Sequence, residues 1–296
     1  MMALLVSGFF LLLLTYKQVV SLRVQLGIYQ DSFDDQYVGC VDRMESLAPD
    51  ILKEERQINK ALDVAWLDAS ETWPIRKTLI KSLPAGFKEE YGIALLVYSN
   101  MTLPVYKQLN RAVREYGTNS SSFSFHSLHF YLTRALALLR DGCAGQPWLT
   151  YRGSSKIMFE PPSNLSDPVR LGQFTSSSTD IKEAQQFGNA SFFNITTCFG
   201  AAIEKFSYFP SQKEVLIPVD EVFHVVRYIE KGNKFVLQSS SRRCSFYNCA
   251  YLGGIKRQHC TYNSAAATLK NSIEVTASLL VVFCIVLTSF VNGLVS

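Results

Sequence analysis

The sequence predicts an α+β protein, and two patterns along the chain support that prediction. Apolar residues recur at helical spacing in the first half, whereas the second half holds short runs rich in β-branched and aromatic residues. Helices that precede strands favour an α+β arrangement over alternating βαβ units. The chain has 296 residues, 48% of them hydrophobic, and is therefore long enough to bury a sizeable core.

Three stretches of the first half show the helical pattern. The first covers residues 57–66, with Ile58, Leu62 and Ala65 on one face. The other two are marked by apolar residues three or four positions apart: Val105, Leu109, Val113 and Tyr116, closed by Gly117, and Leu128, Leu132, Ala135, Leu138 and Leu139, closed by Gly142. We expect all three apolar faces to pack into the core.

Five stretches of the second half predict strands: residues 148–152, 191–199, 214–218, 223–229 and 235–239. A short helix at 180–187, closed by Gly188, interrupts them. The chain contains neither a GxGxxG motif nor a P-loop, so any nucleotide site is not of the Rossmann or P-loop kind.

Both ends of the chain carry processing signals. Residues 1–21 hold the apolar run 4–14 followed by Val19, Val20 and Ser21, which predicts a secretory signal peptide. Residues 277–295 are apolar and uncharged, and small residues and a more polar spacer, 263–266 and 268–276, precede them. This order predicts a GPI-attachment signal, with a tail-anchored transmembrane helix as the alternative. We expect an ectodomain at 22–263, a removed segment at 264–296 and a location on the extracellular face of the plasma membrane.

The cysteines agree with an extracellular location. One of the seven, Cys284, lies in the terminal apolar segment, which leaves six in the ectodomain: Cys40, Cys143, Cys198, Cys244, Cys249 and Cys260. An even number suits disulfide bonding in an oxidising compartment, although spacing leaves 15 pairings open. Neither a CxxC pair nor a histidine at ligand spacing favours a zinc site.

Sequons and charge add two further expectations. Asn-x-Ser/Thr occurs five times, so we expect glycosylation of a secreted surface, at one or more of Asn100, Asn119, Asn164, Asn189 and Asn194. The net charge is only +4 and the basic residues are scattered, so no nucleic-acid partner is expected.

Three polar residues lie in local contexts that point to one kind of chemistry. Arg152 follows an aromatic residue, Ser176 lies in Gly-Gln-Phe-x-Ser-x-Ser, and Glu214 ends Phe-Pro-x-x-x-Glu before Val-Leu-Ile-Pro. Singly they would be a surface arginine, a polar turn and a charged strand start. Together, and in this order, they resemble the active-site triplet of the GPI-anchored ecto-mono-ADP-ribosyltransferases, from about residue 32 to 249. Within that family, we expect the Dombrock blood-group-like subgroup to be the nearest.

The chemistry of NAD cleavage explains why such residues are needed. When the nicotinamide–ribose bond breaks, the ribose gains oxocarbenium character, which a carboxylate beneath it stabilises. The planar fork of an arginine suits the pyrophosphate, and a small hydroxyl can fix the carboxylate's rotamer. The resemblance therefore implies that Arg152 binds NAD, Ser176 positions NAD and Glu214, and Glu214 is catalytic. NAD would be consumed as a substrate, with no metal.

Further roles follow from the resemblance alone. Tyr98, Ser207 and, more weakly, Gln173 would contact NAD, while Phe187 would stack near the nicotinamide; apolar surroundings make Tyr98 and Phe187 equally plausible core residues. The resemblance also implies an N-terminal helical part on two small facing sheets with NAD in the cleft between them. Its implied disulfides are Cys40–Cys249, Cys143–Cys198 and Cys244–Cys260, and residues 32–40, including Asp34 and Asp35, are expected to be structural.

One position departs from the family pattern. Arginine-modifying members carry Glu-x-Glu, whereas this chain has Gln212-Lys213-Glu214. A neutral Gln212 can hydrogen-bond a guanidinium but can neither balance its charge nor take its proton. We expect Lys213 to repel an arginine acceptor. NAD cleavage should survive, with weak transfer to extracellular acceptor proteins. The alternatives are an NAD glycohydrolase and a catalytically silent GPI-anchored surface antigen.

Overall fold

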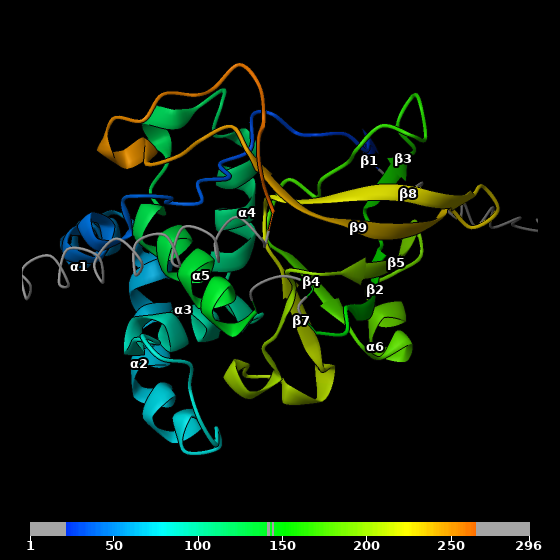
Figure 1. Ribbon diagram of the computed structural model, residues 1–296. Helices are drawn as coiled ribbons and strands as arrows, with labels where there is room; N and C mark the ends of the chain where they lie inside the picture. The colour runs from blue at the N-terminus through cyan, green and yellow to red at the C-terminus, as the bar shows by residue number, and fades with distance from the viewer. Residues whose placement is uncertain (1–21, 141–142, 144, 265–296) are drawn as a thin grey trace, which may run out of the picture.

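The computed structural model describes residues 22–264 except 141, 142 and 144. The expected signal peptide lies outside the described residues, as does the attachment segment apart from Ser264. Among the helices of this described part, none combines the length and apolar character needed to cross a bilayer. The fold is α+β, as predicted, with most of the helices grouped on one side of the molecule and the strands on the other (Figure 1).

Five helices form the N-terminal part: α1 Val41–Ile58, α2 Lys60–Lys77, α3 Glu89–Ser99, α4 Val105–Glu115 and α5 His126–Leu139. The helices predicted around residues 105–116 and 128–139 are confirmed as α4 and α5. The helix predicted at 57–66 is wrong at its start, because α1 ends at Ile58 and Asn59 adopts an extended conformation. The Asn59 side chain accepts a hydrogen bond from the Leu62 amide and caps α2.

Helix α3 shows why the spacing of apolar residues does not reveal every helix. Almost every residue from Tyr91 to Ser99 is buried, so the helix has no polar face to create a 3.6-residue pattern. It packs against α2 and α5 in the middle of the helical part. Trp73 of α2 fills the space over Gly92, where even a Cβ atom would lie 2.4 Å from the indole ring. A segment buried on all sides has a continuous apolar sequence, which fits a strand as well as a helix.

The second half supplies nearly all the strands: β2 Trp148–Ser154, β3 Ile157–Glu160, β4 Thr175–Ser178, β5 Ser191–Thr197, β6 Ala201–Ala202, β7 Glu214–Ile217, β8 Glu221–Ile229, β9 Lys234–Ser245 and β10 Thr261–Ser264. Strand β1, Leu22–Gln25, precedes the helices, and the short helix α6, Ile181–Gln186, lies where it was predicted. Single 3₁₀ turns occupy Ser120–Ser122, Glu204–Phe206, Pro210–Gln212 and Ala250–Leu252.

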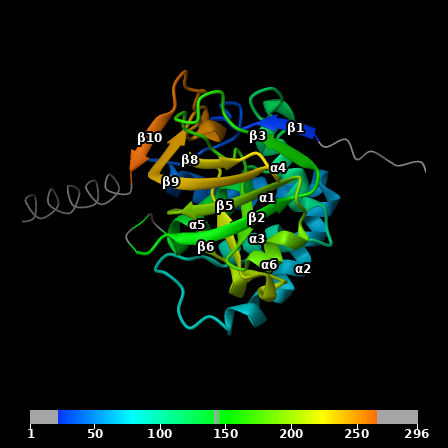
Figure 2. The same ribbon diagram turned by 90° about the vertical axis from the view of Figure 1, so that its right-hand side faces the viewer.

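The strands form a mixed β core of two sheets, as predicted, but the two sheets differ greatly in size. The main sheet follows the order β10-β9-β5-β2-β4-β7-β6, with β8 paired to β9, and a small parallel pair joins β1 to β3. Strand β5 runs parallel to β9 and the other pairs of the main sheet are antiparallel, so the sheet is mixed. Figure 2 shows β8, β9, β5 and β2 side by side in front of the helices.

The two halves of the main sheet meet at one residue pair. Strands β2 and β4 share only Tyr151 and Ser178 as partners, whereas β2 and β5 pair along their full length from Trp148 to Ser154. The β4-β7-β6 part therefore diverges from the β9-β5-β2 part beyond this pair. The predicted division into two parts is present, but a hydrogen-bonded joint connects them.

The disulfides and the N-terminal segment agree with the resemblance. All three expected pairs are formed, with Cα–Cα distances of 6.2, 4.6 and 5.5 Å for Cys40–Cys249, Cys143–Cys198 and Cys244–Cys260.

The two aspartates of the N-terminal segment bind the backbone near the end of β9. Asp34 accepts hydrogen bonds from Arg170 and from the amides of Phe246 and Tyr247. Asp35 accepts from the amides of Tyr37 and of residues 249 and 250. Both aspartates are therefore structural.

Candidate active site

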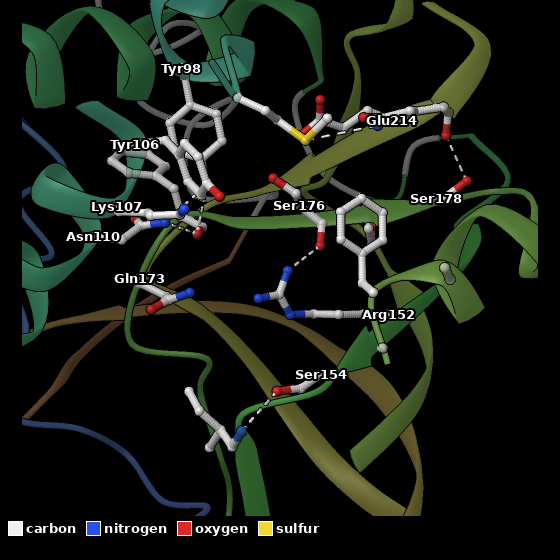
Figure 3. Close-up of a pocket in the computed structure, with 18 of the residues that line it drawn as sticks. Tyr98, Tyr106, Lys107, Asn110, Arg152, Ser154, Gln173, Ser176, Ser178 and Glu214 are labelled. Carbon is white, nitrogen blue, oxygen red and sulfur yellow. Dashed lines mark hydrogen bonds between the residues drawn. The ribbon is translucent and has the colours of Figure 1, made fainter. Parts of the chain in front are cut away.

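A cavity of about 460 Å³ opens beside the joint between β2 and β4. Residues of α3 and α4 form one wall, and β2, β4, α6 and the loop before β7 form the others. Arg152, Ser176 and Glu214 all line it, so the fold brings together three residues that are far apart in the sequence (Figure 3).

Arg152 lies inside β2, two residues before its end, rather than at the end of a strand as expected. Its Nη1 donates a hydrogen bond of 2.6 Å to the Ser176 carbonyl oxygen. Burial lowers the pKa of Arg152, while the nearby Tyr98 and Glu214 raise it. A guanidinium remains charged in proteins, so Arg152 presents a positive charge to the cavity.

Glu214 is the first residue of β7 and is only 7% exposed. Burial raises the pKa of its carboxyl group, and a hydrogen bond from Ser176 and the charge of Arg152 partly offset that rise. A carboxylate in such a poorly hydrated place interacts more strongly with a developing positive charge than it would in water.

Ser176 connects the other members of the site. Its hydroxyl group lies near Glu214 and Tyr98, and its carbonyl oxygen accepts from Arg152. Figure 3 shows Ser176 between Arg152 and Glu214. These contacts are the ones that a positioning role for this serine requires.

Tyr98 and Phe187 differ in burial. Tyr98 is 3% exposed and belongs to the core of the helical part, yet it also lines the cavity. Its hydroxyl donates to the Phe174 carbonyl oxygen at 2.9 Å and accepts from Asn110 at 3.1 Å, and burial raises its pKa to about 12. Phe187 is 46% exposed at the cavity, so its interpretation as a core residue is wrong.

The remaining predicted NAD contacts divide between the cavity and the protein interior. Gln173 lines the cavity and accepts a hydrogen bond from Arg114. Ser207 is not among the lining residues; it is fully buried, and its hydroxyl oxygen accepts from the Phe209 amide at 3.0 Å. The structure therefore places Ser207 as support for the loop before Glu214 and not on the cavity wall.

Helix α4 supplies residues that the sequence analysis missed. Tyr106, Lys107, Asn110 and Arg114 line the cavity, and three of them are four positions apart on one side of the helix. The apolar residues of this helix predicted a core face, but the stripe beside it carries no apolar pattern that would mark it. The buried Asn110 was the available signal, because a polar residue next to an apolar stripe needs a partner.

Gly153 follows Arg152 in β2 and lies against the end of α6. A Cβ atom at this position would lie 2.4 Å from the Gly188 carbonyl oxygen and 2.5 Å from that of Ala184. The absent side chain therefore makes room for the C-terminal end of α6. This close approach fixes the neighbouring Phe187 beside β2.

The loop before Glu214 also corrects one electrostatic argument. Gln212 lines the cavity, and its amide nitrogen lies 3.8 Å from the Met101 sulfur. Lys213 instead pairs with Asp180, with 3.1 Å between Nζ and Oδ2. Because this partner balances its charge, Lys213 does not present the unopposed positive charge that we expected to repel an arginine acceptor.

Within residues 22–264, apart from 141, 142 and 144, no three His, Cys, Asp or Glu side chains are grouped closely enough to hold a metal ion. The cavity does gather the guanidinium of Arg152, the hydroxyl of Ser176 and the buried carboxylate of Glu214. An α+β fold that gathers these groups around one cavity, without a Rossmann motif, defines the class of NAD-dependent ADP-ribosyltransferases.

The comparison with protein families identifies the particular family. The model of NAD:arginine ADP-ribosyltransferase matches residues 26–245, and the chain belongs to this family. The resemblance stated for about residues 32–249 is thereby confirmed.

Curated relatives and solved structures agree. The chain is 48% identical over 244 residues to human ecto-ADP-ribosyltransferase 5, covering 79% of this chain and 83% of the relative. It is 37% identical over 277 residues to mouse GPI-linked NAD(P)(+)--arginine ADP-ribosyltransferase 1, covering 88% of this chain and 83% of the relative. None of these matches tests the expected nearness to the Dombrock-like subgroup, which stays a prediction.

Among solved structures, the eukaryotic mono-ADP-ribosyltransferase ART2.2 has a TM-score of 0.71 and 41% identity over 77% of this chain and 99% of its own. Two mutants of ART2.2, each at TM-score 0.70 and 40% identity, over the same 77% and 99%, were solved in complex with NADH and with NAD. The fold that surrounds the cavity is thus one in which a nicotinamide dinucleotide binds in a relative.

Proposed function

We propose that this chain is an NAD-dependent mono-ADP-ribosyltransferase whose active site is the cavity lined by Arg152, Ser176 and Glu214. The observation that carries the proposal is the position of Ser176, which lies between the guanidinium and the buried carboxylate and whose carbonyl oxygen accepts from Arg152. No chemical reason exists to keep these three groups together in a silent surface protein, so that alternative is disfavoured.

Each group has a task in the reaction. Arg152 binds the pyrophosphate and ribose of NAD through its planar fork. As the bond between the nicotinamide nitrogen and the ribose C1′ breaks, its electron pair leaves with nicotinamide. Glu214 stabilises the positive charge that develops on the ribose, with Ser176 fixing its orientation. An acceptor nitrogen then bonds to C1′ and loses its proton to a base or to water.

The remaining walls complete the nucleotide site in this proposal. Tyr98 and Asn110 form the buried side of the cavity, and Arg114 with Gln173 supplies polar contacts for the dinucleotide. Phe187 offers an exposed ring on which the nicotinamide can stack. NAD is consumed as a substrate, and no metal takes part in the proposed step.

We place the protein outside the cell. The disulfides suit an oxidising compartment, and the ectodomain of residues 22–263 follows a signal peptide and precedes a GPI-attachment signal in our interpretation of the sequence. The name of the mouse relative, GPI-linked NAD(P)(+)--arginine ADP-ribosyltransferase 1, supports this placement. Extracellular proteins are then the natural acceptors of ADP-ribose.

The test uses secreted protein incubated with NAD, with and without agmatine, a small guanidine. We expect ADP-ribosyl-agmatine from the parent and none from Glu214→Gln. The variant should still bind NAD, because the change removes only a charge and Arg152 remains. If Glu214→Gln forms as much product as the parent, the assignment of Glu214 is wrong.

NAD hydrolysis is the second candidate, and Gln212 is the observation that favours it. A neutral amide at the cavity cannot accept the proton of a guanidinium acceptor, so water competes for the ribosyl group. Free ADP-ribose that depends on Glu214, with no agmatine adduct, would identify a glycohydrolase or a transferase for another acceptor.

A further inference from the structure

The turn between β4 and α6, residues 178–180, holds the backbone just before Glu214. The Ser178 hydroxyl donates a hydrogen bond of 2.7 Å to the Gln212 carbonyl oxygen. The Thr179 amide donates to the Lys213 carbonyl oxygen at 3.2 Å. The Lys213 ammonium donates to Asp180 Oδ2 at 3.1 Å. We call these three contacts the clasp.

The conformation of Lys213 shows why this stretch needs to be held. Lys213 has φ 47° and ψ 48°, the left-handed region that a residue with a Cβ atom seldom adopts. Such a conformation persists only where surrounding contacts impose it. The 3₁₀ turn Pro210–Gln212 precedes it and Glu214 begins β7 directly afterwards, so Lys213 alone joins the two elements. The clasp supplies contacts of this kind to Lys213 and to the neighbouring Gln212.

The clasp also connects the loop to the opposite wall of the cavity. Asp180 caps the start of α6 by accepting from the Lys182 amide at 3.0 Å, and its own amide donates to the Ser178 hydroxyl oxygen at 2.9 Å. The other end of α6 leads into Phe187, which lines the cavity. The six-residue helix is thus a short rigid connection between the loop that carries Gln212 and the exposed ring.

We propose that Asp180 is a positioning residue that, through Lys213, holds Gln212 at the cavity and so determines how the ADP-ribosyl group divides between a guanidine acceptor and water. The inference rests on the proposed function and concerns the acceptor side alone. Of the groups proposed to bind NAD, Arg152 and those of α4 lie outside the clasp, and Phe187 stays in place as long as α6 keeps its cap.

Asp180→Asn is the variant that tests this role. The asparagine oxygen can still accept from the Lys182 amide and cap α6, so the change removes only the charge and the acceptor that face Lys213. We expect KM for agmatine to rise about threefold, because an exposed ion pair is worth at most roughly a fivefold change in an equilibrium constant. The proportion of NAD hydrolysed to free ADP-ribose should rise, and KM for NAD should stay the same.

A double-mutant cycle identifies the partner. Lys213→Gln should reproduce the Asp180→Asn effect, and the double variant should show no further change, because the two substitutions remove the same contact. Glu183→Gln, on the same helix but outside the clasp, is the matched control and should behave as the parent. Additive effects of Asp180→Asn and Lys213→Gln, or an equal rise in KM for NAD, would overturn the proposal.

A second measurement does not depend on activity. Hydrogen–deuterium exchange of the peptide that covers residues 208–214 should be faster in Asp180→Asn than in the parent, with α5 unchanged in both. If the parent transfers no ADP-ribose, the proposed function fails in the unmodified protein, and this exchange experiment still tests the clasp. Equal exchange in the parent and the variant would show that Asp180 does not hold the loop.

Discussion

Asp34 and Arg170 form an ion pair with no exposed side-chain surface, with 2.5 Å between Oδ2 and Nη1. The guanidinium also donates to the carbonyl oxygens of Ile28, Tyr29 and Cys244. The pair therefore joins the N-terminal segment to the stretch that leads to β4 and to the end of β9. Burial raises the pKa of Asp34 to about 6, against the lowering effect of Arg170 and of two backbone amides.

Asp34→Asn should lower the free energy of unfolding by about 3–5 kcal/mol, because it leaves a buried guanidinium without its counter-charge. Denaturant unfolding followed by fluorescence measures this loss. Asp31→Asn is the control, since Asp31 pairs with Lys256 at the surface and should cost less than about 1 kcal/mol. Similar losses in the two variants would mean that the buried pair has no special role.

Local sequence identified the triplet but not the contacts among its members. Arg152, Ser176 and Glu214 could be found because each lies in a short, distinctive context. The Asp180–Lys213 pair could not be found, because it joins residues 33 positions apart through a register that only the folded sheet defines. The charge of Lys213 therefore has no visible partner along the sequence, whereas Asp180 balances it in the fold.

A helix or strand could be predicted from the sequence where one of its faces is buried and the other is exposed. Helix α4 alternates buried Leu109 and Val113 with exposed residues, and its limits were found nearly correctly. Helix α3 and strand β4 are buried almost throughout, so neither shows a period. The break at Asn59 was missed because the apolar spacing continues across it, and only the capping contact to Leu62 marks it.

Glu55 should give the protein a distinct dependence of stability on pH. It accepts hydrogen bonds from the Ser127 amide and hydroxyl and from the His126 amide at the start of α5, and burial raises its pKa to about 7 from 4.5. Between those values the folded protein keeps a proton that the unfolded chain has released. The contribution of Glu55 to the free energy of unfolding therefore falls as pH rises from about 4.5 to 7, by on the order of 3 kcal/mol.

The buried His129 and the partly buried His126 act in the opposite direction over part of this range, so the comparison must use a variant. Burial lowers the pKa of His126 to about 4 and that of His129 to about 3, which makes their contribution rise with pH. The difference between the parent and Glu55→Gln isolates Glu55. Between about pH 4.5 and 7.5, the free energy of unfolding should change with pH at different slopes in the parent and in Glu55→Gln. Glu71→Gln, on the exposed face of α2, should follow the parent. Parallel curves for Glu55→Gln would contradict the prediction.

Gly153→Ala should displace the end of α6. The added methyl group would meet two backbone carbonyl oxygens at 2.4 and 2.5 Å, which cannot move aside as a flexible side chain could. We expect a loss of about 1–3 kcal/mol in the free energy of unfolding and weaker NAD binding through Phe187. Gly27→Ala, where a Cβ atom meets nothing within 4 Å, is the control. Unchanged stability in Gly153→Ala would show that α6 is free to shift.

The asparagines of the five sequons differ in burial, and burial decides whether a glycan can be attached to them. Asn100 is 6% exposed, and its side chain accepts from Thr102 and donates to Asp68, so a glycan there is incompatible with the fold. Asn164 is exposed in a loop. Glycopeptide mass spectrometry of secreted protein should find Asn100 unmodified and Asn164 glycosylated. A fully occupied Asn100 would mean that the end of α3 is packed differently.

Gln212→Glu should strengthen transfer to a guanidine, because a carboxylate at the cavity can both attract the cationic acceptor and take its proton. We expect the rate of agmatine ADP-ribosylation to rise by about tenfold or more, since general-base catalysis contributes at least that much where the base is well placed. The release of nicotinamide in the absence of an acceptor should change little, because Glu214 and Arg152 are untouched. Gln212→Leu, which is similar in size and uncharged, is the control and should not gain transfer. If Gln212→Glu gains no more than Gln212→Leu, the residue at this position does not govern the acceptor, and the preference for water must arise elsewhere in the cavity.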